Sequence, residues 1–376
     1  MRVLVVHPGH DTSTTDVYRG LTEGLESIGV DVIRYDLGVR WQMAGIALHE
    51  LWREGGKPDE IPEFGQVMFE AGRALYADVL MYQPDVTLVV TGTMLHPDHL
   101  VLLRRGGCPC AIVDTESPYL TDQLAERFSL ADIVWTNERS AVGEIQRLVK
   151  ERGANTQVSY LPTAYDPASH VPGSARRSHD VVFVGTGFME RMRMLLDADW
   201  SGIDLGLYGN WWQLPGPWPL VKRQDKTWAR WSLGAMSKIG QASPLWKHVA
   251  GSNVSNALVR DLYRGAHVNL NFFRSSKLFS PDTEHIPYGE SMGPRCSELA
   301  AQECFFISEY RSEVEEKFGD LVPTFRNGRE LEHEVRRWLS DEKGREAKAS
   351  ALPGVVTSDT YRERAKRIAS DLKKII

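Results

Sequence analysis

The chain has 376 residues, a formal net charge of −6 at pH 7 and 42% hydrophobic residues. This composition is typical of globular proteins and excludes a collagen, a coiled coil and a disordered chain. At roughly 100–200 residues per domain, the length predicts two domains or three. No apolar run approaches the ~18 residues of a membrane span, so we expect a cytoplasmic protein.

The first part of the chain alternates short apolar runs with helical patterns. Strands are predicted at residues 2–6, 30–35, 85–90, 110–113, 131–136 and 158–161, and helices near 17–28, 98–105 and 140–151. Strands that alternate with helices indicate a parallel sheet covered on both faces. We therefore predict a Rossmann-like domain over residues 1–170, which ends in a proline-rich linker.

The same alternation restarts after the linker. Strands are predicted at residues 180–184, 203–208, 268–272 and 304–308, and helices near 189–196 and 296–302. This pattern predicts a second Rossmann-like domain over residues 171–356. A capping box then opens a last helix at Thr360, and its apolar stripe needs a surface to cover. Residues 357–376 are expected to form this helix.

Two strand-end loops are candidates for ligand contact, because ligands of open α/β sheets bind beyond the carboxyl ends of the strands. His10 lies in a loop that leads into a helix, where backbone amides can meet an anion. Gly185, Thr186 and Gly187 follow the first strand of the second half, and Arg191 lies just beyond. A glycine turn admits a ligand and arginine suits phosphate. A capped helix start and a solvated arginine are the alternatives.

Residues 288–301 carry the strongest signal in the sequence. Glu290 and Glu298 lie eight positions apart, with Gly293 and Arg295 between them. Glu298 falls in the first turns of a predicted helix, whose N-terminus attracts anions. A carboxylate there can accept ribose hydroxyls while neighbouring amides and Arg295 meet phosphates. The alternative is a charged loop before an exposed helix.

The spacing Glu290-x-x-Gly293-x-x-x-x-Glu298 resembles the E-x-F-G-x(4)-E motif of retaining GT-B glycosyltransferases. Residues 294–301 with 305–311, and residues 269–272 upstream, resemble the spore-maturation CgeB-like branch of that group. Residues 161–167 and 360–364 are similar to it as well. The likeness covers most of residues 80–376, and Met292 stands where the usual residue is aromatic.

The resemblance implies an α/β fold of two Rossmann-like domains facing a cleft, the GT-B fold, with the last helix crossing back to the first domain. It implies a nucleotide-sugar donor held mainly by the second domain. A UDP-sugar is favoured, with guanosine and thymidine nucleotides left open, and no cofactor or metal is required if side chains and amides stabilise the leaving group. Glu298 would accept the ribose hydroxyls and Glu290 would lie near the donor hexose. Gly293, Pro294 and Arg295 would face the diphosphate, although Pro294 lacks an amide hydrogen.

A basic, tryptophan-rich insert is predicted over about residues 211–250. Residues 220–250 hold six Lys or Arg and one Asp, a net charge of +5, which leaves −11 for the rest of the chain. Basic residues among aromatic ones suit a polyanion with stackable bases. They also suit a glycan or a membrane surface, or a hairpin packed on its domain. The candidate acceptor-binding residues are Lys222, Arg223, Lys226, Arg230, Trp228 and Trp231.

Other polar groups were weighed for catalysis and metal binding. Asp114 and Glu116 end a strand of the first domain, where a carboxylate can orient or deprotonate an acceptor hydroxyl. Asp197-Ala198-Asp199 and the His96 and His99 pair are better explained by helix ends and caps, so no metal site is expected. Four cysteines without a C-x-x-C pair are too few for a disulfide framework and are expected to be buried thiols.

The resemblance implies a hexosyltransferase, retaining and metal-independent, that uses a nucleotide sugar. The insert suggests DNA carrying hydroxymethylated pyrimidines as the acceptor, as in bacteriophages that sugar-coat their genomes. A cell-surface glycan or a small molecule is an alternative acceptor. A non-catalytic protein that binds nucleotide sugars or polyanions is the alternative function, and an NAD-dependent oxidoreductase lacks its glycine fingerprint.

Overall fold

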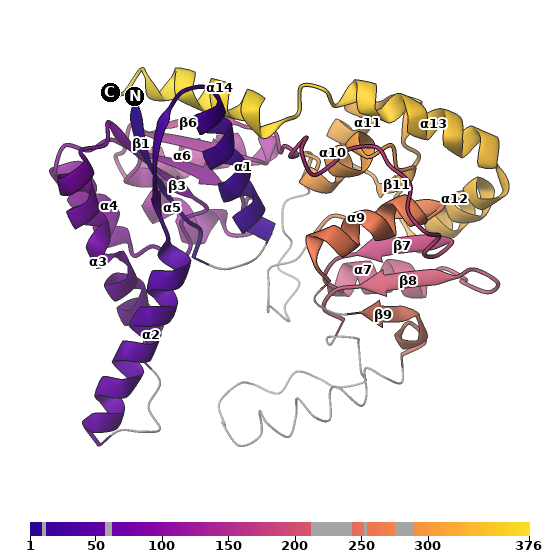
Figure 1. The fold of residues 1–376 in the computed structure, drawn as a ribbon, viewed down its shortest axis with the longest axis horizontal. Coiled ribbons are helices and arrows are strands. Elements are labelled where there is room, and N and C mark those ends of the chain that lie inside the picture. Colours follow the sequence, from indigo (N-terminus) through magenta and orange to yellow (C-terminus); the bar gives the residue numbers. More distant parts are fainter. Residues whose placement is uncertain (10–12, 57–61, 212–242, 252–253, 275–288) are drawn as a thin grey trace. The chain divides into compact units, whose positions relative to one another are not determined.

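The structure is a computed structural model, which describes residues 1–9, 13–56, 62–211, 243–251, 254–274 and 289–376 (Figure 1). The chain divides into two compact units. The first contains residues 1–164 and 358–376, and the second contains residues 165–357. Each unit holds a parallel six-stranded sheet with helices, which confirms the predicted α/β class.

The sheet of the first unit has the order β2-β1-β3-β4-β5-β6, and all its neighbouring strands are parallel. Its strands are β1 (Arg2–Val6), β2 (Asp31–Tyr35), β3 (Val86–Val90), β4 (Cys110–Asp114), β5 (Ile133–Thr136) and β6 (Gln157–Tyr160). Its helices are α1 (Ser13–Ser27), α2 (Leu37–Glu54), α3 (Phe64–Tyr82), α4 (Pro97–Arg105), α5 (Thr121–Ser129), α6 (Val142–Glu151) and α14 (Tyr361–Leu372). The six strands predicted from the sequence are confirmed, with small shifts at their ends.

The central strands β3, β4 and β5 are buried at every position because both faces of this sheet are covered. Alternate side chains of a strand point to opposite faces, so Val3 and Val5 join one core and Leu4 and Val6 the other. Helices α3 to α6 cover one face, and α1 and α14 cover the other. This pattern explains why continuous apolar runs predicted the strands correctly.

The last helix, α14, returns to the first unit and packs along α1 (Figure 1). Thr360 caps it by accepting a hydrogen bond from the Glu363 amide, as the capping box predicts. The two helices approach closely because α1 has glycine at the contact. A Cβ atom on Gly24 would lie 2.8 Å from the carbonyl oxygen of Tyr361. The predicted crossover helix is therefore confirmed, and glycine in α1 makes room for it.

The second unit has the strand order β12-β11-β10-β7-β8-β9, again with parallel neighbours. Its strands are β7 (Val181–Val184), β8 (Leu205–Tyr208), β9 (Val249–Gly251), β10 (Val268–Asn271), β11 (Phe306–Glu309) and β12 (Thr324–Phe325). Its helices are α7 (Met189–Leu196), α9 (Asn256–Gly265), α10 (Pro294–Ala301), α11 (Ser312–Phe318), α12 (Gly328–Ser340) and α13 (Glu342–Val355).

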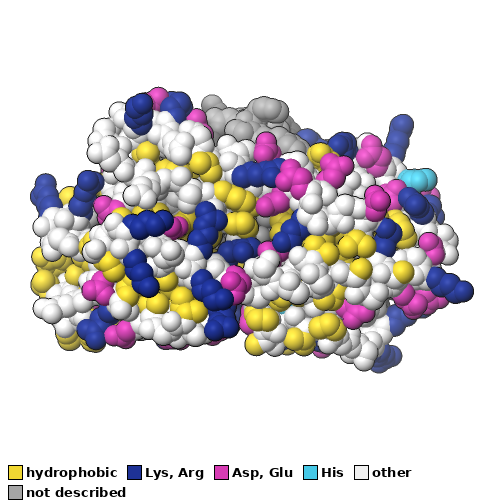
Figure 2. All heavy atoms as spheres, turned by 90° about the horizontal axis from the view of Figure 1, so that it is seen from above, with side chains coloured by type: hydrophobic (Ala, Val, Ile, Leu, Met, Phe, Trp, Pro, Cys, Tyr) yellow, Lys and Arg dark blue, Asp and Glu magenta, His cyan; other side chains and the backbone are white. Residues whose placement is uncertain are grey.

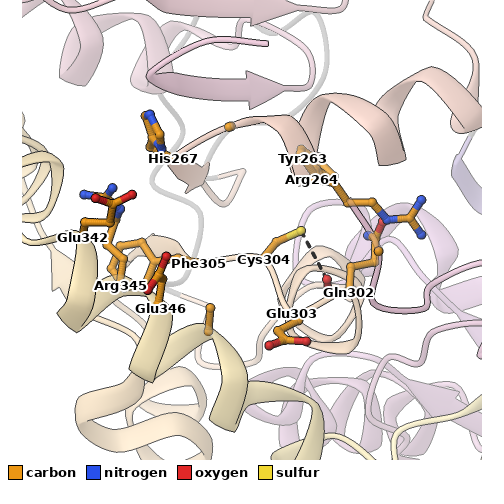
Figure 3. A pocket seen from close by; sticks show the side chains of 13 residues that line it. Tyr263, Arg264, His267, Gln302, Glu303, Cys304, Phe305, Glu342, Arg345 and Glu346 are labelled. Carbon is orange, nitrogen blue, oxygen red and sulfur yellow. Dashed lines mark hydrogen bonds between the residues drawn. The ribbon is translucent and has the colours of Figure 1, made fainter. Parts of the chain in front are cut away.

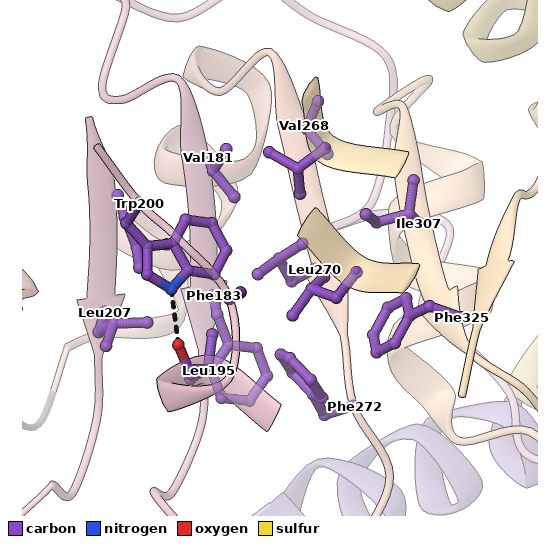
Figure 4. Close-up of a cluster of buried hydrophobic side chains, with 14 of the residues drawn as sticks. Val181, Phe183, Leu195, Trp200, Leu207, Val268, Leu270, Phe272, Ile307 and Phe325 are labelled. Atoms are coloured by element: carbon purple, nitrogen blue, oxygen red, sulfur yellow. Dashed lines mark hydrogen bonds between the residues drawn. The ribbon is translucent and has the colours of Figure 1, made fainter. Parts of the chain in front are cut away.

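Aromatic and aliphatic side chains together fill one face of the second sheet (Figure 4). Phe183 and Phe272 meet edge to face with ring centroids 5.1 Å apart, and Phe272 meets Phe325 in the same way at 5.3 Å. Trp200 closes the cluster beside α7, and its indole N–H donates to the Leu195 carbonyl at 2.7 Å. This packing fixes the strands whose carboxyl ends carry the candidate site.

Several features of the fold differ from the sequence-based expectation. Strands β9 and β12 and helices α5, α11, α12 and α13 have no counterpart among the predicted elements. No helix is predicted for residues 37–82, yet α2 and α3 form there. Several of their large apolar side chains, among them Met43, Ile46 and Leu80, are exposed, so no single buried stripe marks a helix. The chain also enters the second unit at Tyr165 rather than near residue 170, because the Tyr165 side chain packs in that unit's core. All four cysteines are buried free thiols.

Candidate functional site

The carboxyl ends of β7, β10 and β11 lie next to one another at one edge of the second sheet. Parallel strands bring the residues that follow them to the same edge, which is where ligands bind in open α/β sheets. The turn after β7 begins at Gly185, and Arg311 follows β11. Helix α10 starts at Pro294 and places Arg295 in its first turn. This edge therefore brings together most of the residues predicted to bind the donor.

Arg295 is one of two cations that lie against the Gly185 turn. Its Nε donates to the Tyr263 hydroxyl at 3.1 Å, and its Nη1 lies 3.5 Å from Asn271 Oδ1. A Cβ atom on Gly185 would lie 3.2 Å from Arg295 Nη2. The guanidinium is thus aimed across the end of β7, with the Phe183 ring 5.2 Å from its central carbon.

Two opposing effects set the charge of Arg295. Burial acts to lower the pKa of the guanidinium, whereas Tyr263 and Glu298 act to raise it, and the pKa lies above its ordinary value. Arg295 therefore remains a cation at the edge of the sheet. Glu298 is three residues further along α10, and residues at this spacing lie on the same face of a helix. Burial also raises the pKa of Tyr263, which keeps its hydroxyl protonated as a partner for Arg295.

The glycines of the turn after β7 are required by close packing. A Cβ atom on Gly187 would lie 2.5 Å from the Trp211 ring. The amide of Gly185 donates to the Tyr208 carbonyl at 2.8 Å, and the amide of Gly187 donates to the Asn210 carbonyl at 2.8 Å. The turn is therefore anchored to the end of β8, and two of its amides already have backbone partners.

Arg191 holds this turn to the end of β10. Its side chain is 7% exposed and donates to the carbonyls of Thr186 at 2.9 Å, Phe273 at 3.2 Å and Phe272 at 3.4 Å. An arginine with three carbonyl partners fixes backbone and also adds positive charge to the site. The structure thus gives Arg191 a supporting position that the sequence pattern did not reveal.

Helix α10 begins with Gly293 as its N-cap residue and Pro294 at its first position. Proline suits this position because its missing N–H has no partner within the helix. Cys296 and Leu299 are buried on the inner side, whereas Arg295 and Glu298 are partly exposed. The positive end of the helix dipole and Arg295 therefore act at the same place.

The loop before α10 is held by the start of α11. Glu290, the first glutamate of the motif, is partly exposed, and the next two residues are buried. The Met292 amide donates to Glu313 Oε2 at 2.6 Å, and Arg311 Nη1 donates to the Ser291 carbonyl at 2.8 Å. Neither Arg311 nor Glu313 was predicted as a site residue.

A third residue missed by the sequence reasoning is Glu309, at the end of β11. Its Oε2 accepts a hydrogen bond from the Phe273 amide at 2.8 Å. Burial raises the pKa of this carboxyl, against the opposing effects of that hydrogen bond and of Arg311 and Arg191. Tyr263 and Asn271 were missed as well. Their only sequence signals were an aromatic residue late in a helix and an asparagine inside an apolar strand.

The two carboxylates predicted in the first unit lie in different environments. Asp114 is fully buried and accepts hydrogen bonds from the Ser117 hydroxyl and from the Glu116 amide at 3.0 Å. Burial raises the pKa of the Asp114 carboxyl. The side chain of Glu116 is partly exposed. Asp114 thus shapes the loop after β4, and Glu116 is the more accessible acid.

Several predicted residues lie outside the described part of the chain. They are His10, Lys222, Arg223, Lys226, Trp228 and Arg230 together with Trp231. Figure 2 shows Lys and Arg side chains among Asp and Glu on the face viewed from above, so the charge of the described surface is mixed there. Among the described residues, no group of three or more His, Cys, Asp or Glu is arranged to hold a metal ion. No helix in that part is long and apolar enough to cross a membrane.

A cavity of about 270 Å³ lies at the opposite edge of the second sheet, where His267 precedes β10 and Phe305 precedes β11 (Figure 3). Its lining is balanced between basic and acidic side chains: Arg264, His267, Arg345, Glu303, Glu342 and Glu346. Arg264 donates to the Val171 carbonyl at 2.7 Å and Arg345 to the Leu339 carbonyl at 3.0 Å. Two of its cations therefore already donate hydrogen bonds to backbone carbonyls. The lining as a whole favours neither an anionic nor a cationic ligand.

Comparison with known proteins identifies the fold. Residues 190–370 match a family model described as glycosyl transferase-like. No curated protein matches the chain in sequence. Among solved structures, the chain is similar to sucrose-phosphate synthase from Thermosynechococcus elongatus, with a TM-score of 0.65 and 13% identity. That match covers 100% of this chain and 98% of the synthase chain. The fold is that of the GT-B glycosyltransferases.

Two further solved structures are similar to this chain. One is a complex with UDP-glucose, and the other is an enzyme that modifies DNA. The Anabaena protein HepE, in complex with UDP-glucose, matches with a TM-score of 0.59 at 13% identity over 100% of both chains. The DNA-modifying enzyme β-glucosyltransferase matches with a TM-score of 0.57 at 12% identity, over 100% of this chain and 99% of its own. At these identities the likeness shows the fold alone.

Proposed function

We propose that this chain is a glycosyltransferase that moves a sugar from a nucleotide-sugar donor, a UDP-hexose, to an acceptor hydroxyl. The GT-B fold and the glycosyl transferase-like match over residues 190–370 support the reaction class. The observation that carries the proposal is the position of Arg295, a cation held against the Gly185 turn at the carboxyl edge of the second sheet. We also propose that the chain belongs to the CgeB-like branch of these enzymes.

The proposed donor site uses positive charge beside two glycine turns. Transfer breaks the bond between the sugar and the diphosphate, so negative charge grows on the leaving group. Preorganised donors aimed at that charge stabilise the transition state. Arg295 supplies the cation, and the turns at Gly185–Gly187 and Gly293 allow close approach of the backbone. Glu298, on the same face of α10, would accept the ribose hydroxyls.

Arg191 and Pro294 have indirect roles in this proposal. The three carbonyl contacts of Arg191 keep the Gly185–Gly187 turn in place, and its charge adds to that of Arg295. Pro294 offers no amide to the phosphate, and the guanidinium of Arg295 would supply that interaction instead. Because side chains provide the positive charge, we propose that the reaction needs no metal.

Glu290 is proposed to face the donor hexose, and Glu116 to orient the acceptor hydroxyl. A partly exposed carboxylate can accept the hydroxyl proton, whereas the buried Asp114 already holds its own loop. Retention of configuration at the sugar rests on the Glu290 and Glu298 spacing. A cytoplasmic location is part of the proposal.

The proposed acceptor is DNA that carries hydroxymethylated pyrimidines. The support is the charge of the insert, +5 over residues 220–250, together with its tryptophans. Phosphate contacts by basic residues drive DNA binding, and a modifying enzyme must take its base out of the stack. A cell-surface glycan or a small alcohol is the second candidate acceptor, because tryptophan faces also stack on sugars.

The donor is tested by a thermal-shift screen across UDP-, GDP- and dTDP-sugars, followed by a hydrolysis assay. A ligand at 100 times its Kd stabilises a native protein by about 2.7 kcal/mol. We expect UDP-hexoses to raise the Tm and to be hydrolysed slowly by water. A raised Tm without hydrolysis or transfer would favour a non-catalytic binding protein. A screen without any shift, and without turnover, would refute the glycosyltransferase proposal.

The acceptor is tested with Lys222, Arg223, Lys226 and Arg230 all replaced by alanine. We expect activity on hydroxymethylated DNA to fall and its salt dependence to weaken, because each lost phosphate contact reduces the slope by about 0.9. Hydrolysis of the donor should persist in this variant. Wild-type protein that ignores such DNA with every donor, or a variant with an unaltered salt slope, would refute DNA as the acceptor.

A further inference from the structure

The backbone of the loop Glu290–Met292 is hydrogen-bonded at three consecutive residues. The partners are Arg311, the N-cap residue of α11, and Glu313 in its first turn. The Glu313 amide donates to the Glu290 carbonyl at 3.2 Å. Arg311 Nη1 donates to the Ser291 carbonyl at 2.8 Å, and Glu313 Oε2 accepts from the Met292 amide at 2.6 Å. Arg311 and Glu313 thus fix the backbone of all three loop residues.

Arg311 also ties this loop to the end of β10. Its Nη2 donates to the Arg274 carbonyl at 3.3 Å, and its guanidinium lies 4.1 Å from the centre of the Phe273 ring. The side chain is only 7% exposed. An arginine in this position is committed to backbone carbonyls and an aromatic face, which distinguishes it from Arg295 at the Gly185 turn.

Burial makes these hydrogen bonds strong. Ser291 is 2% and Met292 is 3% exposed, so water does not compete for their backbone groups. Hydrogen bonds to a charged partner are worth more than neutral ones, and an unmade one in a buried place is costly. The loop therefore has one well-defined backbone path, which in turn fixes the position from which the Glu290 side chain projects.

We propose that Arg311 and Glu313 are positioning residues for Glu290 in sugar transfer. This inference rests on the proposed function and adds to it two residues outside the glutamate motif. They act through the backbone of the loop and contact no part of the donor in this proposal. In the proposed function Arg295 and Glu298 of α10 hold the nucleotide, so we expect a change confined to the loop to affect sugar transfer more than nucleotide binding.

This expectation gives a kinetic test based on Glu313→Ala. A displacement near 1 Å in a catalytic group costs on the order of 10- to 100-fold in rate, so we expect kcat to fall by that much while the affinity for UDP changes less than about twofold. Glu313→Gln keeps an oxygen for the Met292 amide and should restore most of kcat. Glu315→Ala, an exposed acid on the same helix, is the matched control and should leave both values unchanged.

A double-mutant cycle with Glu290→Gln shows whether Glu313 acts through Glu290. Residues that act as one unit are not additive, so adding Glu313→Ala to Glu290→Gln should lower kcat no further. Hydrogen exchange of the Met292 amide gives a readout that needs no turnover. It should become faster in Glu313→Ala and stay slow in Glu313→Gln.

The outcomes separate this inference from the proposed function. Turnover in the wild type, with kcat and UDP affinity falling together in Glu313→Ala or with additive effects in the cycle, overturns the positioning role alone. An unchanged exchange rate at Met292 in Glu313→Ala does the same. A wild-type protein without any turnover refutes the proposed function and this catalytic role with it.

Discussion

Replacing Arg295 tests the donor site most directly, and two substitutions give a graded result. Arg295→Ala removes the cation, its hydrogen bond to Tyr263 at 3.1 Å and the Nη2 group that lies beside Gly185. Loss of one preorganised donor at a developing charge costs about 10²–10³ in kcat, or ~2.7–4 kcal/mol. We expect this loss in turnover, with a smaller loss in donor affinity, because charge on the leaving group grows in the transition state.

Arg295→Lys keeps the charge but loses the planar fork. A lysine ammonium cannot bond Tyr263 and face the Gly185 turn at once, because its donors lie at a single point. The contact with Asn271, at 3.5 Å, is at the limit of a hydrogen bond and adds little. We therefore expect a loss of roughly tenfold in kcat, about 1.4 kcal/mol.

The assay is steady-state hydrolysis or transfer with a UDP-hexose, beside UDP binding measured by calorimetry. Arg193→Ala is the matched control, because Arg193 is an exposed arginine on α7. The Tm of each variant shows whether the fold is intact. Equal losses in turnover and donor affinity would mean plain ground-state binding, and full activity in Arg295→Ala would refute the site.

Three further changes have defined outcomes. Glu298→Ala should weaken UDP binding by ~1–3 kcal/mol in calorimetry, the cost of leaving a polar partner unpaired, and unchanged affinity would remove Glu298 from the site. Gly24→Ala should lower the Tm despite the better helix propensity of alanine, ~1 kcal/mol, because its Cβ would lie 2.8 Å from the Tyr361 carbonyl. Gly143→Ala on α6, which meets nothing within 4 Å, should raise the Tm instead. Burial raises the pKa of Glu309, so the contribution of this carboxyl to stability falls as pH rises from its unfolded pKa through its folded pKa. Glu309→Gln cannot ionise, so its Tm relative to the wild type should increase with pH, whereas a Tm difference between the two proteins that does not change with pH would contradict the assignment.

Most strands were predictable because they are short apolar runs, and the central ones are covered on both faces. The short strands β9 and β12 were not predicted. Val181–Val184 and Val86–Val90 are buried at every position, so the sequence pattern and the packing agree. Helices α2 and α3 were not predicted, because Met43 and Leu80 are exposed and blur the apolar stripe. The sequence pattern therefore predicts an element reliably only where its apolar residues are also its buried residues.

The arrangement of the candidate site was predictable where its residues share one short segment. Arg295 and Glu298 stand on the same helix, and their spacing alone puts them on one face. Tyr263 and Arg311 reach the site from other elements, through contacts that depend on the order of strands in the sheet. The inward position of Asp114 likewise depends on Ser117, which the loop folds back upon it.

The return of α14 to the first unit affects the order in which the protein can be completed during synthesis. Domains generally fold as they leave the ribosome, N-terminal first. Here the contact between α1 and α14 joins Gly24 to Tyr361, so the face of the first sheet beside α1 stays uncovered until the ribosome has passed residue 372. The second unit, residues 165–357, emerges entirely before that point. The N-terminal sheet is therefore the first to be made and the last to be completed, and the apolar face of α14 reaches its core only at the end of synthesis.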